Sequence, residues 1–218
     1  MLFIGSQPVL YTYFRSSCSW RVRIALAWKG IEYESKYVNL VKDGGQQRQE
    51  EYAAINPMKQ VPALVMNGST MTQSVAMLEY LEEVHPEKPL LPKDPLDKVK
   101  VREIVSVISG GIQPLQNLSV LQKIGDDGKM EWGKFWIDKG FVALEQILKR
   151  TAGKYCVGDS VTMADACLVP QVYNANRFKV DMDQFPTISR INNALLQLDA
   201  FQESHPSKMD DCPENLRS

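Results

Sequence analysis

The residues best suited to chemistry lie in one short stretch, FRSSCSWRVRIAL, at positions 14–26. Ser16, Ser17 and Cys18 come at the start of a helical pattern, where free backbone N–H groups and the positive end of the helix dipole stabilise an anion. A thiol held at such a place ionises more readily than a free cysteine, whose pKa is about 8.5. The stretch therefore predicts a thiolate site. The residues alone leave open whether the sulfur belongs to Cys18 or to a bound thiol.

Three arginines, at positions 15, 21 and 23, flank this site. Charged residues of a helix are usually solvated or paired at the surface, and we expect the same of these arginines. Arg15 and Arg21 could in addition contribute positive potential for an anionic substrate.

The remaining composition excludes several kinds of site. The four cysteines form no C-x-x-C pair, and the first ten residues lack a secretory signal, so we predict reduced thiols in a cytoplasmic protein. His85 and His205 each precede a proline and lie far in sequence from any candidate nucleophile. We therefore predict neither a histidine-based catalytic centre nor a metal site. A net charge of −1 predicts no nucleic-acid partner. We predict no membrane span either, because no apolar run nears the required length of roughly 18 residues.

The elements that position the chemical residues alternate between strand and helix over the first 85 residues. Residue type and periodicity predict the order β-α-β-α-β-β-α, at residues 9–14, 17–29, 33–40, 46–53, 61–68, 69–73 and 74–84. The first crossover should be parallel, and the last two strands should form an antiparallel hairpin turned at Asn67-Gly68.

The composition changes after residue 85. Four prolines within residues 86–95 predict an extended linker, and strand signals fade beyond it. We expect helices there at about 96–122, 131–150, 162–177 and 187–203. The sequence therefore predicts an α+β domain with a thioredoxin-like pattern over residues 1–85, a linker over 86–95, and an all-helical domain over 96–218.

Two further segments of the first domain indicate the shape of a ligand. Val61-Pro62 opens a predicted strand, at the place where a thioredoxin-like fold has a cis-proline. The N–H and C=O of Val61 would then be free for an extended peptide. Gln73 and Ser74 lie where a strand gives way to a helix, which suits a carboxylate, although plain helix capping is the alternative. Together the segments predict a peptide-like ligand that carries a free carboxylate.

Two motifs of the helical domain receive a structural interpretation. Thr162 and Asp165 have the S/T-x-x-D form of a capping box ahead of an apolar helix, so we do not expect Asp165 to be catalytic. Gly110-Gly111 is too short for a phosphate loop, and we expect it to let helices pack closely or bend.

Five blocks of the sequence resemble zeta-class glutathione transferases, the maleylacetoacetate isomerases. The blocks are SSCSWRVRIAL, NPMKQVPAL, TQSVAMLEYLEE, GGIQPLQNLSVL and YCVGDSVTMADACLVPQVYNANRFKVD, at residues 16–26, 56–64, 72–83, 110–121 and 155–181. They occur in the order of the family, and the resemblance extends from about residue 8 to 205. It implies the glutathione transferase architecture, with a thioredoxin-like glutathione-binding domain, a helical domain that binds the substrate, and assembly as a homodimer.

The resemblance also implies which residues act. The expected glutathione contacts are Ser16, Ser17, Cys18, Ser19, Trp20, Arg21, Gln47, Val61, Gln73, Ser74, Gln113, Asn117, Leu118 and Ser119. The catalytic candidates are Ser16 and Ser17, as stabilisers of the thiolate of glutathione, and Cys18, whose part in turnover stays open. Arg177 matches the arginine that binds the carboxylate of the organic substrate, since a guanidinium fits a carboxylate with two hydrogen bonds.

The implied reaction is the cis–trans isomerisation of 4-maleylacetoacetate to 4-fumarylacetoacetate in phenylalanine and tyrosine breakdown. The thiolate of glutathione adds to the conjugated double bond, the bond rotates and glutathione leaves, so that glutathione acts as a cofactor. The family also processes α-halo acids such as dichloroacetate. Two alternatives remain at this point, a thiol oxidoreductase that uses Cys18 and a non-enzymatic scaffold.

Overall fold

The structure is a computed structural model that describes residues 7–217, so residues 1–6 and 218 of the two predicted domains lie outside it. By its internal contacts the chain forms two compact units. The first unit contains the residues up to Lys88 together with those from Ala200 onward, and the second unit is Pro89–Asp199.

The first unit is built on a four-stranded sheet, with strands β1 (Val9–Thr12), β2 (Glu34–Tyr37), β3 (Ala63–Met66) and β4 (Ser69–Thr72). The strand order is β2-β1-β3-β4, with β1 parallel to β2 and β3 antiparallel to both of its neighbours. The predicted parallel crossover and the hairpin are both confirmed. The hairpin turns at Asn67 and Gly68, which have φ angles of 53° and 74°, as a tight turn between twisted strands requires.

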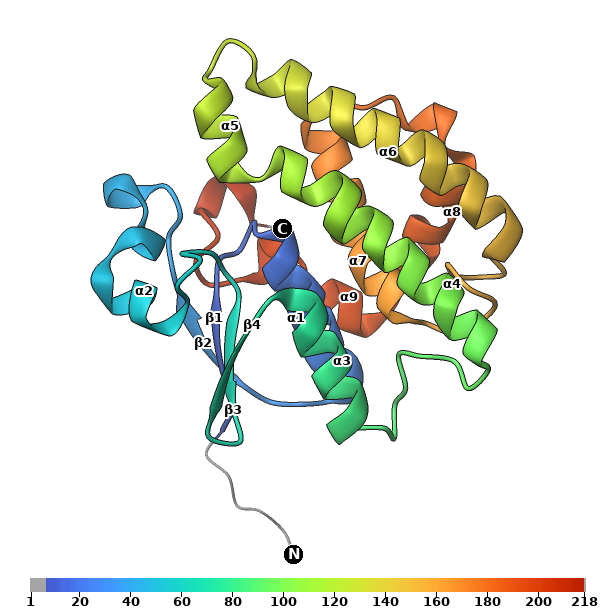
Figure 1. Cartoon of the computed structure of the whole chain (residues 1–218), viewed down its shortest axis with the longest axis horizontal. Coiled ribbons are helices and arrows are strands. Elements are labelled where there is room, and N and C mark those ends of the chain that lie inside the picture. Colours follow the sequence, from blue (N-terminus) through green and yellow to red (C-terminus); the bar gives the residue numbers. More distant parts are fainter. Residues whose placement is uncertain (1–6, 218) are drawn as a thin grey trace, which may run out of the picture. The chain divides into compact units, whose positions relative to one another are not determined.

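Three helices accompany the sheet, α1 (Ser17–Lys29), α2 (Glu50–Ile55) and α3 (Ser74–Val84). Helices α1 and α3 pack against each other on one side of the sheet, and α2 lies on the other side (Figure 1). Helix α1 is buried on nearly all of its surface, including the four consecutive residues Arg21–Ile24. It ends at Gly30, whose left-handed φ of 69° lets its N–H bond back to the last turn.

The carboxy-terminal segment belongs to the first unit, whereas the sequence analysis placed it in the helical domain. Helix α9 (Asp199–Glu203) and the short helical turns η6 (Pro206–Lys208) and η7 (Glu214–Leu216) make up this segment. The Trp20 Nε1–H donates to Ser204 Oγ at 3.0 Å, and the Arg23 Nε–H donates to Ser204 O at 3.2 Å. Buried donors need acceptors, and the carboxy-terminal segment supplies them to α1.

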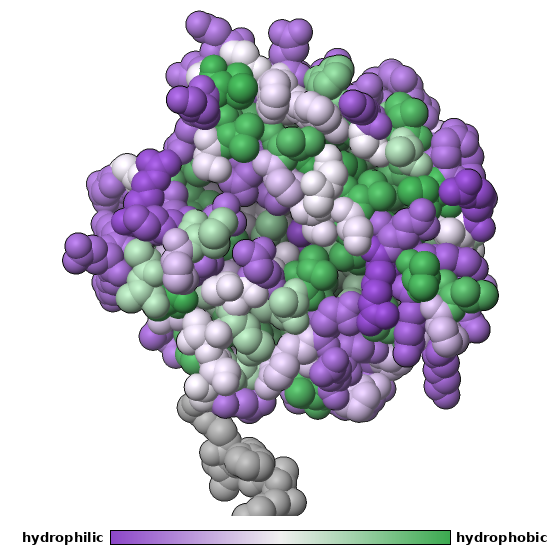
Figure 2. All heavy atoms as spheres, in the orientation of Figure 1, coloured by the Kyte–Doolittle hydropathy of each residue, from purple (hydrophilic) through white to green (hydrophobic). Residues whose placement is uncertain are grey.

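The second unit is all-helical, as predicted. Its elements are α4 (Pro95–Ser106), η3 (Val107–Ile112), η4 (Gln113–Gln116), α5 (Leu118–Ile124), α6 (Lys129–Thr151), α7 (Met163–Arg177), η5 (Met182–Gln184) and α8 (Pro186–Leu195). Helix α7 packs against α4 and α8, and α6 packs against α5 and α8. Large apolar side chains are exposed on α4 at Leu96 and Val99, and on α6 at Phe135 and Val142. Figure 2 shows hydrophobic side chains gathered over this part of the second unit.

The predicted single helix over residues 96–122 is instead four segments. A π-helical turn, η3, follows α4, and the backbone at Asn117 is extended, with φ −65° and ψ 150°, before α5 begins. Length and composition alone would let Pro95–Ile124 cross a membrane, but the extended Asn117 interrupts it as a continuous helix. Gly110 and Gly111 lie within η3, and a Cβ on either would meet no atom within 4 Å. The close packing that we expected as one possibility at these glycines is therefore absent, and the backbone there is π-helical.

The capping box ahead of α7 is confirmed. Asp165 Oδ2 accepts hydrogen bonds from the N–H and the hydroxyl of Thr162, both at 2.8 Å. Asp165 Oδ1 accepts the N–H of Cys156 at 2.9 Å. Burial raises the pKa of this carboxyl, and the hydrogen bonds oppose that shift. All of these contacts are internal to the second unit, and they support a structural role for Asp165.

Candidate active site

The amino terminus of α1 presents Ser16 in a form that suits anion binding. Ser16 is the N-cap residue, and its Oγ accepts the N–H of Ser19 at 3.2 Å. A hydroxyl has one O–H donor besides its acceptor lone pairs, so this capping bond leaves the proton of Ser16 available. Ser16 and Cys18 are partly exposed, whereas Ser17 is buried. Capping and thiolate stabilisation are therefore compatible at Ser16, which is the most accessible hydroxyl of the predicted pair.

The next two predicted contacts are buried, since Ser19 and Trp20 are 0% and 1% exposed. Ser19 Oγ has no hydrogen-bond partner among the described residues, and the contact of either residue with a ligand stays a prediction. Trp20 packs edge-on against the ring of His205, at 5.1 Å between centroids. We therefore assign both side chains to the interior of the fold.

The strand-side element is present as predicted. The Val61-Pro62 peptide bond is cis, and the strand ladder with β1 begins only at Ala63. Within residues 7–217 the N–H and C=O of Val61 have no hydrogen-bond partner. This backbone is therefore free to pair with an extended peptide.

Two residues that the sequence analysis missed hold the peptide group before Val61. Gln60 O accepts Tyr52 Oη at 2.7 Å and Asn56 Nδ2 at 2.6 Å. Burial raises the pKa of Tyr52, so its hydroxyl keeps the proton that it donates. The only sequence signal for this support is that two side chains able to donate hydrogen bonds, Tyr52 and Asn56, lie eight and four residues before Gln60.

The start of α3 is an uncapped helix end. Gln73, at its N-cap position, has a φ of 69° and makes no side-chain capping bond, and the first turn carries no acidic residue. A left-handed φ is uncommon for a residue with a side chain, and such strain is concentrated at functional sites. The N–H groups of the first turn are therefore available to an anion, as the sequence analysis expected.

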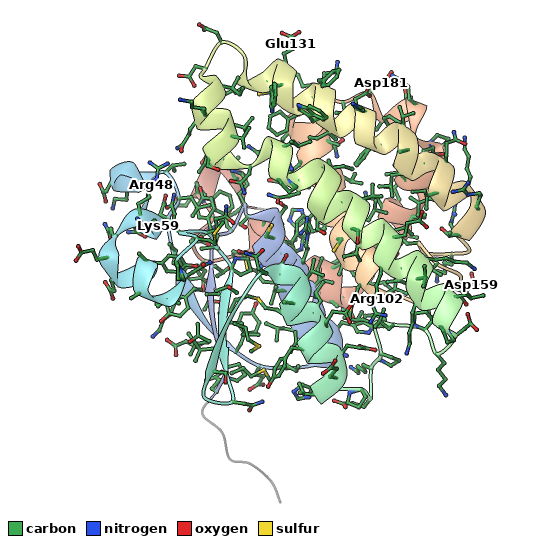
Figure 3. All side chains as sticks on the ribbon, in the orientation of Figure 1. Arg48, Lys59, Arg102, Glu131, Asp159 and Asp181 are labelled. Carbon is green, nitrogen blue, oxygen red and sulfur yellow. The ribbon has the colours of Figure 1, made fainter. Side chains whose placement is uncertain are left out.

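Arg21 lies beside this helix end, and its burial corrects our prediction of a solvated side chain. Most charged side chains project outward, as Arg48 and Lys59 do in Figure 3, but Arg21 is only 2% exposed. Its Nη1 donates to Ser74 Oγ at 3.3 Å, while Nε and Nη2 have no partner among the described residues. Because a buried guanidinium without an anion is costly, Arg21 indicates an anionic group that the described chain does not supply.

Gln47 is a second incompletely bonded side chain of the first unit. It lies in η2 (Gln46–Arg48), which follows η1 (Lys42–Gly44), and its Nε2 donates to Leu40 O at 3.3 Å. Its Oε1 is buried and has no partner in residues 7–217. This oxygen can accept a hydrogen bond from a ligand N–H.

The predicted contacts of the second unit lie on two elements. Gln113 begins η4, and Asn117 caps α5 by accepting the N–H of Ser119 at 3.2 Å. Leu118 is partly exposed beside them. Arg177 is exposed in the last turn of α7, and its Nη1 donates to Asn174 Oδ1 at 3.2 Å. The involvement of these five predicted residues in ligand binding stays a prediction.

No other catalytic centre is evident in the part of the chain that the structure describes. Within it, no cluster of three or more His, Cys, Asp or Glu residues could hold a metal ion. None of the four cysteines forms a disulfide within residues 7–217, and Cys156, Cys167 and Cys212 are buried. Cys18 is thus the accessible thiol among them.

A thioredoxin-like sheet with a cis-proline, followed by a helical unit, defines the glutathione transferase architecture. The sequence matches the family "Glutathione S-transferase, N-terminal domain" over residues 15–84 and "Glutathione S-transferase, C-terminal domain" over residues 128–203. It is 62% identical over 214 residues to the maleylacetoacetate isomerase of Rattus norvegicus, an alignment that covers 98% of this chain and 99% of that protein.

Solved structures agree with the sequence relatives. The maleylacetoacetate isomerase of Anaeromyxobacter dehalogenans 2CP-1, with glutathione bound in its active site, is 42% identical with a TM-score of 0.86, covering 95% of this chain and 98% of that one. A bacterial zeta-class maleylpyruvate isomerase is 36% identical with a TM-score of 0.90, covering 94% and 100%. The chain therefore belongs to the glutathione transferase family, as an enzyme of its zeta class of maleylacetoacetate isomerases.

Proposed function

We propose that the protein binds glutathione and uses it as a cofactor to isomerise 4-maleylacetoacetate to 4-fumarylacetoacetate in phenylalanine and tyrosine breakdown. The observation that carries the proposal is Ser16, an N-cap hydroxyl that is partly exposed and still has a proton to donate. The names of the relatives support the reaction, and the glutathione-bound neighbour supports the ligand.

The residues of the first unit fit glutathione from end to end. The free N–H and C=O of Val61 suit the peptide-like backbone of the ligand, and the unpaired Oε1 of Gln47 can accept one of its N–H groups. The uncapped start of α3, with Ser74 and the partnerless nitrogens of Arg21, suits the γ-glutamyl carboxylate. Each of these groups lacks the partner that the ligand would bring.

When bound, glutathione supplies a thiolate nucleophile that can add to the conjugated double bond and leave again after rotation. The part of the chain is to hold that sulfur at the amino terminus of α1. There the hydroxyl of Ser16 and the free N–H groups of the first turn stabilise negative charge. Ser17 is buried beside Ser16, and we propose that it supports the same negative charge.

Arg177 is part of the proposal as the residue that binds a carboxylate of the organic substrate. Its guanidinium is exposed and is oriented by Asn174, so its planar donors can engage a carboxylate with two hydrogen bonds. The same pairing would serve an α-halo acid such as dichloroacetate, where the thiolate displaces halide. Gln113, Asn117, Leu118 and Ser119 are proposed to contact glutathione from the second unit.

A direct assay tests the proposal. Purified protein is given maleylacetoacetate with and without glutathione, and formation of the fumaryl isomer and consumption of glutathione are followed together. The proposal expects conversion that requires glutathione and leaves its total amount unchanged. Disulfide reduction without isomerisation would instead indicate an oxidoreductase that uses Cys18, and absence of glutathione binding would indicate a scaffold.

We also propose that the protein is a homodimer and is located in the cytoplasm. Leu96 and Val99 on α4 and Phe135 and Val142 on α6 expose apolar side chains, and a second copy would bury such a surface (Figure 2). The absence of a disulfide among the four cysteines of residues 7–217 is compatible with a reducing compartment. Sedimentation of the wild type against Phe135→Glu, with Glu131→Gln on the same helix as a control, tests the assembly. A wild-type monomer would contradict it.

A further inference from the structure

The backbone that leads into Ser16 is held by the carboxy-terminal segment of the same unit. The N–H of Phe14 donates to Asp211 Oδ2 at 2.9 Å, across 197 residues of sequence. Tyr13 O in turn accepts the N–H of Ser16 at 3.0 Å. A chain of two hydrogen bonds therefore connects residues 13–16 to the distant end of the protein.

Arg23 fixes the same stretch from its other side. Its guanidinium is 0% exposed, and its nitrogens donate to Thr12 Oγ1 at 3.1 Å, Tyr13 O at 3.3 Å and Phe14 O at 3.0 Å. Its Nε donates to Ser204 O at 3.2 Å. All three guanidinium nitrogens are thus engaged, and every acceptor lies in β1, in the residues before Ser16 or in the carboxy-terminal segment.

The carboxy-terminal segment is anchored by apolar and polar contacts of its own. Cys212 belongs to a buried cluster with Tyr13 and Phe14, against which Met209 packs. Ser204 Oγ accepts Trp20 Nε1–H at 3.0 Å and donates to Ala200 O at 2.6 Å. These contacts hold the segment in place without Asp211. The carboxylate of Asp211 is therefore at a fixed position when it accepts the Phe14 N–H.

The carboxylate of Asp211 is only partly satisfied by hydrogen bonds. Its Oδ1 is buried and has no partner among the described residues. Burial raises the pKa of this carboxyl, against the N–H of Phe14 and the charge of Arg23, which lower it. A partly buried carboxylate with one unpaired oxygen contributes little net stability, whereas it does set the direction of one backbone N–H.

We infer that Asp211, Arg23 and Ser204 are positioning residues that hold residues 13–16 and so aim the hydroxyl of Ser16 at the bound sulfur. The inference rests on the proposed function, because it gives Ser16 its task. Catalysis is sensitive to such placement, since a misplacement of about 1 Å can cost as much as a hundredfold in rate. None of the three residues touches the ligand in this account.

The test compares Asp211→Ala and Asp211→Asn with Asp210→Ala as a matched control. Asp210 is the exposed neighbouring carboxylate, and it accepts Tyr37 Oη rather than the Phe14 N–H. Three readouts are taken: amide hydrogen exchange at Phe14, the pKa of the glutathione thiol in the complex, and kcat and KM for glutathione.

In Asp211→Ala we expect faster exchange at Phe14, a bound thiol pKa raised by about one unit, and kcat lowered about tenfold with little change in KM. Asp211→Asn should keep most of the wild-type values, because its amide oxygen can still accept the Phe14 N–H. Asp210→Ala should match the wild type in every readout.

Wild-type thiol pKa and kcat in a folded Asp211→Ala protein would overturn the inference, and so would equal losses in Asp211→Asn or Asp210→Ala. If Asp211→Ala does not fold, Asp211→Glu decides, because one added methylene displaces the carboxylate and should still raise the thiol pKa. A wild type without glutathione-dependent activity would contradict the proposed function instead. In that case hydrogen exchange at Phe14 still reports whether Asp211 holds the backbone.

Discussion

At the scale of the residue, Ser16 combines two tasks that a substitution series can separate. As an N-cap it accepts the N–H of Ser19, and as a proposed thiolate stabiliser it donates its proton. Aspartate caps helices as well as serine does, but an ionised carboxylate has no proton to donate. Threonine can do both.

We therefore predict different outcomes for three Ser16 variants. Ser16→Ala should lose about 1 kcal/mol of stability through the missing cap, and at least about tenfold in isomerase turnover. Ser16→Asp should keep the stability and lose the turnover, and Ser16→Thr should keep most of both. Thermal unfolding and steady-state kinetics measure the two properties. Full activity in Ser16→Asp would show that turnover does not need the proton of the Ser16 hydroxyl.

Arg21 gives a second prediction at this scale, in which stability and binding change in opposite directions. The guanidinium is buried, and two of its three nitrogens lack a partner in residues 7–217. Arg21→Met removes that uncompensated charge while keeping most of the volume. The ligand-free protein should unfold at the same temperature or a higher one, and the Kd for glutathione should rise at least about tenfold. Scanning calorimetry measures the unfolding temperature and titration calorimetry measures the Kd, each for the wild type and for Arg21→Met. Unchanged affinity would mean that the anion partner of Arg21 is not the ligand.

The burial of Arg21 and Arg23 could not be predicted from the sequence. Periodicity identifies an exposed face when only one stripe of a helix is buried. In α1 the consecutive residues Arg21, Val22, Arg23 and Ile24 are all buried, so the pattern carries no information about which way the arginines point. The acceptors of Arg23 lie on β1, on the residues before Ser16 and on Ser204, and only the tertiary fold brings them together.

At the scale of the element, the strands and first helix followed from local signals, and the long helix of the second unit did not. The hairpin turn and the end of α1 at Gly30 can be predicted from single residues that readily adopt a positive φ. Gly110, Gly111 and Pro114 lie within the predicted helix and disfavour its continuation, but the prediction of one helix over 96–122 did not take them into account. The extended backbone at Asn117, whose side chain caps α5, then separates the last of the four segments.

The turn around His205 gives an element-scale prediction for pH. His205 Nδ1 accepts the N–H of Ser207 at 3.2 Å, which the imidazolium cannot do. Burial, followed by the charges of Arg23 and Lys208, lowers the pKa of His205 below its usual 6.5. The unfolded state therefore binds this proton more readily, and the stability from this group is present above pH 6.5 and is lost as the pH falls below it.

His205→Asn tests the effect, because asparagine can accept the same N–H without titrating in this range. The free energy of unfolding of the wild type, relative to His205→Asn, should fall between pH 7.5 and pH 5. Chemical denaturation at several pH values measures the difference. A difference that is constant with pH would show that the His205 turn does not sense protonation.

At the scale of the whole molecule, the sequence predicted two parts of the correct classes but divided the chain differently at its end. The proline-rich linker marks the change from mixed to helical structure near residue 88. The return of residues from Ala200 onward to the first unit depends on Trp20, Arg23 and Phe14, which lie more than 180 residues earlier. Helical spacing over 187–203 could not show that its last turns leave the helical unit.

The family and the enzyme class rest on agreement along almost the whole chain, through both matched domains and relatives of similar length. The identity of the nucleophile is a proposal that goes beyond this agreement. We propose that the reactive sulfur is that of bound glutathione and that the amino terminus of α1 supports it, and we predict that turnover does not require the neighbouring Cys18.

A titration of the glutathione thiol by its thiolate absorbance, in complexes with the wild type and with Cys18→Ala, tests this claim most directly. We predict a pKa at least about one unit below that of the free thiol in both complexes, together with retained isomerase activity in Cys18→Ala. A bound thiol that titrates like free glutathione in the wild type, or loss of all activity in a folded Cys18→Ala protein, would contradict the account.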